Sequence, residues 1–481
     1  MGDRVLIYSI HRMESWWRAI GDHLGYDGAV VLTDRRQAGD RWVTDDFYRQ
    51  YRSLRRGGDT SPRLLTEAQV GDVIARCRVL RWLPAPQAEA MAEAMARAME
   101  TVLDEVRPIA LVSFPIDSYV SDVLARRARA RGLPYYELTA SALPDMCMLM
   151  HRGRLITTSR PADPAEVGAR IREIADPLFT PSYVQGQAAY TPARFLKTFG
   201  YFRLRAAFFK LYSRLSRDPL NLHYLDAQPG LGHKPQLSDM RMIDMVEADW
   251  LAKVETAPRE RRVLFGLQLL PEAAIDHWLD DLDFVRHEDR LVDIAERLTA
   301  AGYLIVVKDH PLQFGFRQVA LIDRLKALPN VVIVPYEVSG NALLAMCGVS
   351  VTGTGTLGLQ AALLGLISVV CDAYYVASGE DFIVLRRLED LNELAARIAQ
   401  RDPPASLYDR QARIIEQLLR ASFTADFFSF RNFDPTRAGP ATAELGRRLG
   451  ERLRSLGPDG EDWHARNLPP GGGGQEGSPL R

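Results

Sequence analysis

The chain has 481 residues, with 60 lysine and arginine against 61 aspartate and glutamate side chains, so its formal net charge is −1. A hydrophobic fraction of 47% and a charged fraction of 25% are typical of soluble globular proteins and argue against disordered, fibrous and polytopic membrane classes. The balanced charge gives no reason to expect a nucleic-acid partner, because phosphate binding needs a basic excess. The length predicts two or three domains.

Strand and helix signals alternate along the N-terminal half. Apolar runs predict strands at residues 5–8, 29–32, 109–114 and 135–138, and helical spacing predicts helices near residues 13–24, 87–106 and 119–131. Strands that alternate with helices indicate βαβ units, so we expect a Rossmann-like domain here.

Two segments follow this half. Residues 194–214 interleave phenylalanines with lysines and arginines. Such a helix either lies in a membrane interface, which would suit a lipid-linked acceptor, or packs its aromatic side chains on the core. Residues 216–236 are rich in Pro, Gly and Asn, which predicts a linker.

The C-terminal half gives the clearest alternation. Strands are predicted at residues 263–267, 303–307, 331–334, 349–351 and 367–371, and helices at residues 287–300, 317–328, 341–347 and from 357 onward. This pattern predicts a second parallel, doubly wound sheet.

The expected fold is therefore α/β, with two Rossmann-like domains and a cleft between them. The predicted boundaries are an N-terminal domain at 1–215, a linker at 216–236, a C-terminal domain at 237–435, and a helix with a disordered tail at 436–481. Ligands of open α/β sheets bind at the carboxyl ends of the strands, so the cleft is the expected site.

The four cysteines lie far apart without CxxC spacing, which argues against a disulfide framework or a zinc site. Reduced thiols are expected in the cytoplasm. The charged residues of the first segment argue against a signal peptide.

Lys308 and His310 follow the strand at 303–307, where a parallel sheet places its ligand. An ammonium and an imidazole at this edge are suited to a phosphate, with the lysine as a point charge and the histidine as a hydrogen-bond donor. The alternative is a solvated lysine and a histidine that caps the backbone.

A Thr/Gly turn joins the strand at 349–351 to the next helix. Glycines allow close approach of the backbone, and the turn's N–H groups, its hydroxyls and the helix N-terminus favour an anion. The turn lacks the Gly-Lys-Ser/Thr of a Walker A sequence. A tight strand-to-helix connection is the alternative. The candidate phosphate-binding residues of this turn are Thr352, Gly353, Thr354, Gly355 and Thr356.

The order of these motifs resembles the capsule polysaccharide biosynthesis family, whose members include Kdo transferases of GT-B-like architecture. The resemblance covers residues 261–375 and rests on four segments: Leu264-Phe265-Gly266-Leu267-Gln268-x-x-Pro271-Glu272, Lys308-Asp309-His310-Pro311, Leu328-Pro329-Asn330-Val331, and Thr354-Gly355-Thr356-x-Gly358-x-Gln360-Ala361-x-x-x-Gly365. It implies that His310 and the Thr/Gly turn hold the phosphate of a cytidine nucleotide and that Gln268 orients substrate.

The chain departs from the family pattern at two places, of which one is Gly365-Leu366-Ile367-Ser368, where the family usually has Gly-Lys-Pro-Val. Gln360 stands where the family commonly has a glutamate, and an amide can still hydrogen-bond a ribose hydroxyl, although more weakly than a carboxylate. This departure leaves the donor open and also admits a divergent or inactive member.

Glycosyl transfer needs a carboxylate that faces the sugar. Asp117, after the strand at 109–114, is the first candidate, and Glu137, at the end of the next strand, is the second. Either side chain is otherwise a helix cap or a solvated acid. Glu272 is expected to orient substrate. No DxD-like metal site is evident, so no metal and no cofactor beyond the donor are expected.

The sequence therefore predicts a GT-B-like glycosyltransferase that uses a nucleotide sugar, with a CMP-Kdo-like donor as first choice, to extend a glycan or lipid-linked glycan of the cell surface. The expected location is the cytoplasm, with residues 194–214 at the inner face of the plasma membrane. The alternatives are an isomerase of the UDP-GlcNAc 2-epimerase type and a non-catalytic component of polysaccharide assembly or export.

Overall fold

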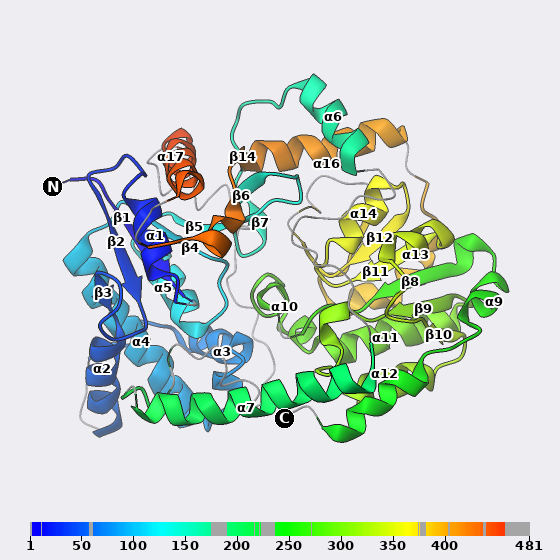
Figure 1. Cartoon of the computed structure of the whole chain (residues 1–481), viewed down its shortest axis with the longest axis horizontal. Coiled ribbons are helices and arrows are strands. Elements are labelled where there is room, and N and C mark those ends of the chain that lie inside the picture. The colour runs from blue at the N-terminus through cyan, green and yellow to red at the C-terminus, as the bar shows by residue number, and fades with distance from the viewer. Residues whose placement is uncertain are drawn as a thin grey trace.

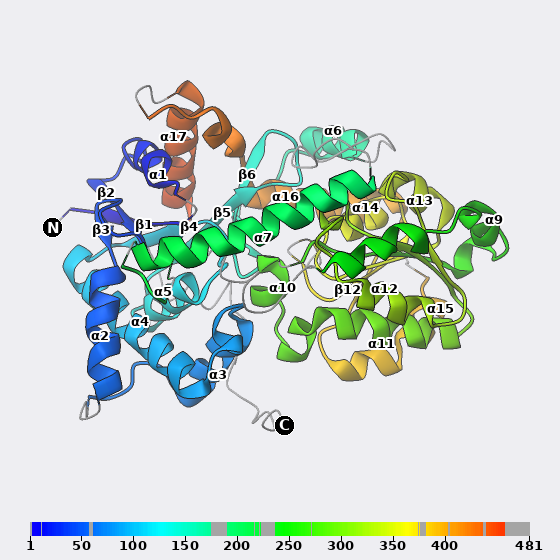
Figure 2. The same cartoon turned by 60° about the horizontal axis from the view of Figure 1, so that its bottom comes forward.

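The computed structural model describes residues 2–10, 12–56, 61–174, 190–215, 217–220, 222, 236–270, 272–373, 375, 381–402, 405–435 and 439–456, without the side chains of residues 209 and 213. The predicted disordered tail at 457–481 and most of the predicted linker lie outside these residues. Figure 1 shows two α/β halves, one built around each sheet, with the long helix α7 (Pro192–Leu215) running past both. Figure 2 shows the same helix lying across the two halves.

The N-terminal sheet has the strand order β14-β6-β5-β4-β1-β2-β3, and β7 pairs with β6. Strands β1 to β5 are mutually parallel, whereas β6 runs antiparallel to both β5 and β14. The strands are β1 (Arg4–Ser9), β2 (Gly28–Thr33), β3 (Arg41–Trp42), β4 (Ala110–Ser113), β5 (Tyr135–Ala140), β6 (Met146–His151), β7 (Arg154–Leu155) and β14 (Ser422–Thr424).

Both faces of this sheet are covered. Along β1, Leu6 and Tyr8 belong to one hydrophobic cluster while Val5 and Ile7 belong to another, as expected from the alternation of side chains along a strand. The helical segments of this half are α1 (Glu14–Gly21), α2 (Thr44–Arg56), α3 (Glu67–Arg76), η1 (Leu80–Trp82), α4 (Ala85–Val106), α5 (Tyr119–Ala130) and α6 (Pro164–Ile174).

The C-terminal sheet has the order β10-β9-β8-β11-β12-β13, and all its strand pairs are parallel. Its strands are β8 (Arg262–Gly266), β9 (Leu304–Lys308), β10 (Val331–Ile333), β11 (Val349–Thr352), β12 (Ile367–Val370) and β13 (Phe382–Val384). Its helical segments are η2 (Leu237–Met245), α9 (Trp250–Glu255), η3 (Arg259–Arg261), α10 (Ala273–His277), η4 (Leu282–Val285), α11 (His287–Ala300), η5 (Pro311–Gln313), α12 (Val319–Lys326), α13 (Gly340–Met346), α14 (Leu357–Leu363), η7 (Leu388–Asn392), α15 (Leu394–Ala399) and α16 (Leu407–Ala421).

The two sheets share one strand order. In each, the first six strands in chain order are arranged 3-2-1-4-5-6, which is the order of the doubly wound Rossmann fold. The predicted fold class, two Rossmann-like α/β domains, is therefore confirmed. The strand order reverses between β1 and β4 in the first sheet and between β8 and β11 in the second. Ligands of such sheets bind outside the carboxyl ends of the strands at this reversal, the switch point.

The chain returns to the N-terminal sheet at Ser422, inside the range 237–435 that the sequence assigns to the second domain. There β14 pairs with β6, and η8 (Phe427–Asn432) and α17 (Pro440–Ser455) follow. Helix α17 packs closely on α1, because a Cβ at Gly446 would lie 2.6 Å from the carbonyl oxygen of Ile20.

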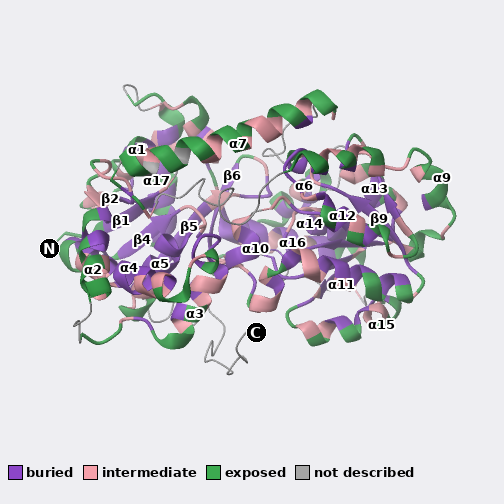
Figure 3. Ribbon diagram, turned by 90° about the horizontal axis from the view of Figure 1, so that it is seen from below, coloured by how far each residue is buried: buried purple, intermediate pink, exposed green. Residues whose placement is uncertain are grey.

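Figure 3 shows buried residues concentrated in both sheets and on the helix faces against them, with exposed residues along α7. No helix among the described residues is both long and apolar enough to cross a membrane.

Candidate functional site between the two domains

Gln268 holds the Thr/Gly turn at the switch point of the C-terminal sheet. The Gln268 side chain follows β8, and its Oε1 accepts a hydrogen bond from the backbone N of Thr354 at 2.7 Å while its Nε2 donates to Thr354 Oγ1 at 2.8 Å. Only glycine fits beside this clamp, because a Cβ at Gly353 would lie 2.1 Å from Gln268 Oε1. The Tyr375 hydroxyl donates to the carbonyl of Gly355 at 2.5 Å. The turn is thus fixed from two sides.

The clamped turn keeps donors for a ligand. Thr352 and Thr354 are buried, whereas Gly355 and Thr356 are partly exposed. The N–H groups of Gly355 and Thr356 find no acceptor among the described residues. Two such N–H groups in a glycine turn suit an anion such as a phosphate.

Glu272 lies beside the same clamp. Its Oε2 accepts a hydrogen bond from Gln268 Nε2 at 3.1 Å. Burial raises the pKa of Glu272 to about 7; Asp276 and Asp117 add to the increase, while Gln268 and Arg78 oppose it. A carboxyl group with this pKa exchanges a proton near neutral pH, as a general acid or base must.

Arg78 joins the two domains at this point. It lies between α3 and η1, and its Nε donates to Oδ2 of Asp276 in α10 at 2.5 Å. Its Nη2 forms an ion pair with Asp117, which follows β4 at the switch point of the N-terminal sheet. The switch points of the two sheets therefore face one another across a single guanidinium.

Two further arginines fasten the same interface. Arg76 donates to the backbone carbonyls of Asp276 and Leu279, at 3.0 and 2.7 Å. Arg81 Nη1 lies 3.1 Å from Asp276 Oδ1. Helix α10 of the C-terminal domain is thus docked on arginines of the N-terminal domain.

Asp117 is placed by its neighbours in sequence. The N-cap of α5 is Ser118, whose hydroxyl accepts from Ser121 N, so Asp117 is left free of a capping role. The side chain of Asp117 is 24% exposed beside Arg78. A sequence-predicted candidate from the N-terminal domain thus comes within electrostatic reach of Glu272 from the other domain.

Glu137 lies beneath this loop. It is in the interior of β5, which runs on to Ala140, and it is fully buried. Its Oε2 accepts from the N–H of Ile116 at 3.0 Å, and its Oε1 accepts from the N–H of Arg152 at 2.6 Å. Burial raises the pKa of Glu137 to about 7, although these two hydrogen bonds act to lower it. The carboxyl group therefore supports the segment that carries Asp117.

Lys308 and His310 follow β9, the strand next to β8. Lys308 Nζ donates to the carbonyl of Tyr336 at 2.8 Å, on the side of β10, and burial lowers the pKa of this lysine to about 8. β8 separates Lys308 from the Thr/Gly turn, a lateral distance of roughly 10 Å at the usual strand spacing.

His310 caps the short helix η5, since its Nδ1 accepts a hydrogen bond from the N–H of Leu312 at 3.2 Å. Burial lowers the pKa of His310, so the neutral ring prevails. With Nδ1 accepting, the ring proton is on Nε2, for which the described residues supply no acceptor. His310 therefore caps the backbone and still offers one N–H.

Asp309, between these two residues, anchors a buried network that the sequence reasoning missed. Its Oδ1 accepts from Nε and Nη2 of Arg317, at 2.9 and 2.7 Å, and its Oδ2 accepts from the Tyr336 hydroxyl at 2.5 Å. Arg317 Nη2 also donates to the carbonyl of Gln268 at 2.6 Å. The network ties the loops after β8, β9 and β10 together.

Gln360 lies apart from the turn. It lines a small cavity of about 140 Å³ together with Leu344 of α13 and Ile174 of α6, and no residue of the Thr/Gly turn lines that cavity. Its predicted contact with a ribose stays a prediction.

The structure thus brings together Asp117, Glu272, Gln268 and the Thr/Gly turn, and places Lys308 and His310 one strand away. It also adds Arg78, which was not a candidate from the sequence. The only local signal there is three arginines, at positions 76, 78 and 81. Among the described residues no group of three or more His, Cys, Asp and Glu side chains is placed to hold a metal ion.

No protein-family model and no curated protein matches the chain. Among solved structures, the chain is similar to KpsC from Thermosulfurimonas dismutans, both to its β-Kdo 2,4-transferase (15% identity, TM-score 0.30, 64% of this chain and 79% of the other) and to its β-Kdo 2,7-transferase (11%, 0.33, 74% and 89%). It is also similar to UDP-GlcNAc 2-epimerase from Neisseria meningitidis bound to UDP-GlcNAc (13%, 0.26, 86% and 99%). Kdo transferases and UDP-GlcNAc 2-epimerases thus both occur among these neighbours.

Proposed function

We propose that the protein transfers a sugar from a nucleotide-activated donor to a glycan acceptor where its two domains meet. The observation that supports this best is the meeting of two switch points, one with Asp117 and the other with Glu272 and the Thr/Gly turn, across Arg78. A donor and an acceptor held on opposite walls of one cleft meet between them.

The donor phosphate is assigned to the C-terminal wall. The N–H groups of Gly355 and Thr356 and the Nε2–H of His310 are the donors that would stabilise charge on the departing nucleotide. Lys308 adds positive charge at the same edge of the sheet. A CMP-linked, Kdo-like sugar is the first choice of donor, on the resemblance of the His310 and Thr/Gly segments.

In the proposed step, Glu272 takes the proton of the acceptor hydroxyl. That oxygen then attacks the anomeric carbon of the donor, and the bond from this carbon to the phosphate oxygen breaks with its electron pair on the nucleotide. Asp117, fixed by Arg78, orients the acceptor from the opposite wall. No metal is assigned a role, and the same rate in EDTA as in Mg²⁺ is expected.

The carboxyl group of Glu272 also favours a second candidate function, the epimerisation of a nucleotide sugar. A group with a pKa of about 7 suits the removal of a proton from a sugar carbon as well as from a hydroxyl. An epimerase needs no acceptor, so the two functions differ in a measurable way.

The deciding experiment is a melting assay with CMP, UDP and GDP, followed by turnover of the matching nucleotide sugars with and without acceptor. A ligand that binds the folded state raises its melting temperature by mass action. We expect stabilisation by CMP and turnover only with acceptor. Turnover without acceptor would support the epimerase, and no shift with any nucleotide would support the non-catalytic alternative.

We also propose that α7 rests on an anionic membrane, where a lipid-linked acceptor would lie. The inner face of α7 packs on the C-terminal domain, with Phe195 buried and the Phe202 ring 4.2 Å from that of Phe316. The outer face shows a stripe of large apolar side chains at heptad spacing, each between 55% and 74% exposed: Tyr201, Leu204, Phe208, Leu211 and Leu215.

The charge of α7 fits this partner. The helix has six cationic and no acidic residues. At about 100° per residue, Arg203, Lys210 and Arg214 fall on one flank of the stripe and Arg194 and Arg205 on the other. Apolar side chains between basic flanks are the arrangement of helices that lie in an anionic membrane interface.

Flotation with phosphatidylcholine vesicles, with and without phosphatidylglycerol, tests this. We expect binding to the anionic vesicles only. Binding should be lost in Leu204→Ser/Leu215→Ser and kept in the control Leu251→Ser/Leu407→Ser, which changes two exposed leucines on α9 and α16. No binding would refute the proposal. Loss of a dimer in the first variant would assign the stripe to a second copy of the chain instead.

A further inference from the structure

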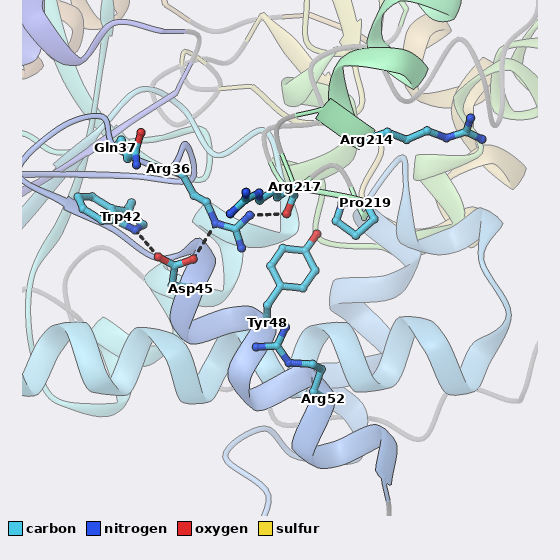
Figure 4. A pocket seen from close by; sticks show the side chains of 9 residues that line it. All are labelled: Arg36, Gln37, Trp42, Asp45, Tyr48, Arg52, Arg214, Arg217 and Pro219. Atoms are coloured by element: carbon cyan, nitrogen blue, oxygen red, sulfur yellow. Dashed lines mark hydrogen bonds and ion pairs between the residues drawn. The ribbon is translucent and has the colours of Figure 1, made fainter.

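A large cavity with a basic lining lies beside the carboxyl ends of β2 and β3. Its volume is about 680 Å³, and four arginines line it together with Trp42 and Tyr48. Figure 4 shows Arg36 and Arg217 side by side, Arg52 next to Tyr48, and Arg214 beyond Pro219. We call this the basic cavity, defined by Arg36, Arg52, Arg214, Arg217, Trp42 and Tyr48.

The fold, and not a basic run in the sequence, gathers these arginines. Arg36 follows β2, Arg52 lies on α2, Arg214 is in the last turn of α7, and Arg217 is in the turn that follows. Like charges repel when they are brought together, so such a cluster is stabilised by an anion bound among them.

Only part of this charge is neutralised within the protein. Arg36 Nε donates to Asp45 Oδ1 at 2.7 Å, and Arg36 also donates to the carbonyl of Arg217. For the side chains of Arg52, Arg214 and Arg217 the described residues supply no carboxylate partner. Asp45 is the single acid in the lining, so the charges of Arg52 and Arg217 remain for a ligand.

The floor of the basic cavity is built firmly. The Tyr48 hydroxyl donates to Asp218 Oδ1 at 2.6 Å and accepts from the N–H of Leu220 at 3.0 Å, which holds the turn after α7 in place. Asp218 Oδ2 accepts from the N–H of Leu222 at 2.7 Å. In this turn Arg217 has a φ of +57°, a conformation that costs a non-glycine residue energy and clusters at functional sites.

Aromatic rings complete the lining. Trp42 is fixed by its Nε1, which donates to Asp45 Oδ2 at 2.7 Å, and the Arg36 guanidinium lies 5.5 Å from the centroid of the Tyr48 ring. Rings of this kind pack on the apolar face of a sugar, while guanidinium groups bind carboxylate or phosphate in a bidentate manner. The volume is that of a site for a ligand of a few rings.

From this combination we infer that the basic cavity binds an anionic sugar unit, with a carboxylate or phosphate group, of the acceptor glycan. The identity of this ligand as acceptor rests on the proposed function; the binding of the anion does not. The basic cavity and Asp117 share the carboxyl edge of the N-terminal sheet, the wall assigned to the acceptor.

Calorimetric titration tests the inference with three probes: hyaluronan tetrasaccharide, which has carboxylates, the neutral maltotetraose, and inorganic phosphate. We expect the tetrasaccharide to bind, maltotetraose not to bind, and the affinity to fall with added salt. Arg52→Gln/Arg217→Gln should weaken binding at least tenfold. The matched control, Arg55→Gln, removes an exposed arginine of α2 outside the lining and should leave binding unchanged.

Three results would overturn the inference: no binding of the tetrasaccharide, equal binding of maltotetraose, or equal loss in the control. Binding of phosphate alone would assign the basic cavity to a free anion instead of a sugar. The shift in melting temperature with CMP should be the same in the double variant and the wild type. The two hypotheses can therefore fail separately. If the donor-site hypothesis is wrong, CMP causes no shift in melting temperature while the tetrasaccharide still binds.

Discussion

Asp117 of the N-terminal domain and Asp276 of the C-terminal domain bind the same guanidinium, that of Arg78. Arg78 and Asp276 are both largely buried. A buried cation between two carboxylates fixes the distance between the two domains at this point, and with it the distance between the groups that we propose act on donor and acceptor.

Replacing Arg78 should therefore weaken both the fold and the activity. Arg78→Gln leaves the Asp276 carboxylate buried without its closest cation, and removing one partner of a buried pair costs about 3 kcal/mol. Urea denaturation measures this loss. The control Arg81→Gln removes a half-exposed arginine at 3.1 Å from the same aspartate and should cost less than about 1 kcal/mol. Equal losses in both variants would show that Arg78 has no special role.

Glu272 should make stability depend on pH. Because burial raises its pKa from 4.5 to about 7, the folded state prefers the protonated form, and this stabilisation is complete below pH 4.5 and is lost as the pH rises through 7. Glu272→Gln mimics the protonated form at every pH. Between pH 5 and pH 8, the stability of this variant should thus rise by about 2 kcal/mol relative to wild type. Comparing the two proteins cancels the similar contribution of Glu137.

The activity should change with pH in the direction opposite to the stability. A general base acts in its ionised form, so the rate of the wild type should increase with pH up to about 7 and Glu272→Gln should lose most of it. A rate that is flat from pH 5 to pH 8, together with an active Glu272→Gln variant, would exclude Glu272 as the base.

The sequence predicted the fold because its core strands are short apolar runs bounded by turn residues, as in 263–267 and 303–307. It missed β6 and β14, which lie at an edge of the N-terminal sheet and pair with each other although about 270 residues separate them. Pairing over such a distance leaves no local pattern, whereas a βαβ unit repeats its signal within some 30 residues.

The candidate site shows the same limit. Asp117 and the Thr/Gly turn were found because each follows a recognisable strand at the edge where ligands bind. Arg78 was not, because an arginine between two helical segments has no distinctive context until the fold brings Asp117 and Asp276 to it. The contact of Lys308 was also not visible in the sequence: its ammonium donates to the carbonyl of Tyr336, which follows the neighbouring strand, and its role toward a phosphate stays a prediction.

Gln268 should control nucleotide affinity through the Thr/Gly turn. Gln268→Ala removes both hydrogen bonds to Thr354, so the turn loses its fixed shape and the melting shift with nucleotide should fall by at least half. Gln268→Glu keeps an oxygen for the N–H of Thr354 but places a second carboxylate beside Glu272, which should raise the pKa of Glu272 further. An undiminished nucleotide shift in Gln268→Ala would separate this clamp from the donor site.

His310 offers the sharpest separation of structure from binding, because its two ring nitrogens do different things. Nδ1 caps η5, whereas Nε2–H is available to a phosphate. Asparagine can place its side-chain oxygen as the cap but has no group at the position of Nε2. His310→Asn should thus keep wild-type stability and weaken nucleotide binding about tenfold, while His310→Ala should also lose about 1 kcal/mol of stability. Titration with nucleotide and urea denaturation of both variants measure the two effects. Unchanged nucleotide affinity in His310→Asn would leave this imidazole with its capping role alone.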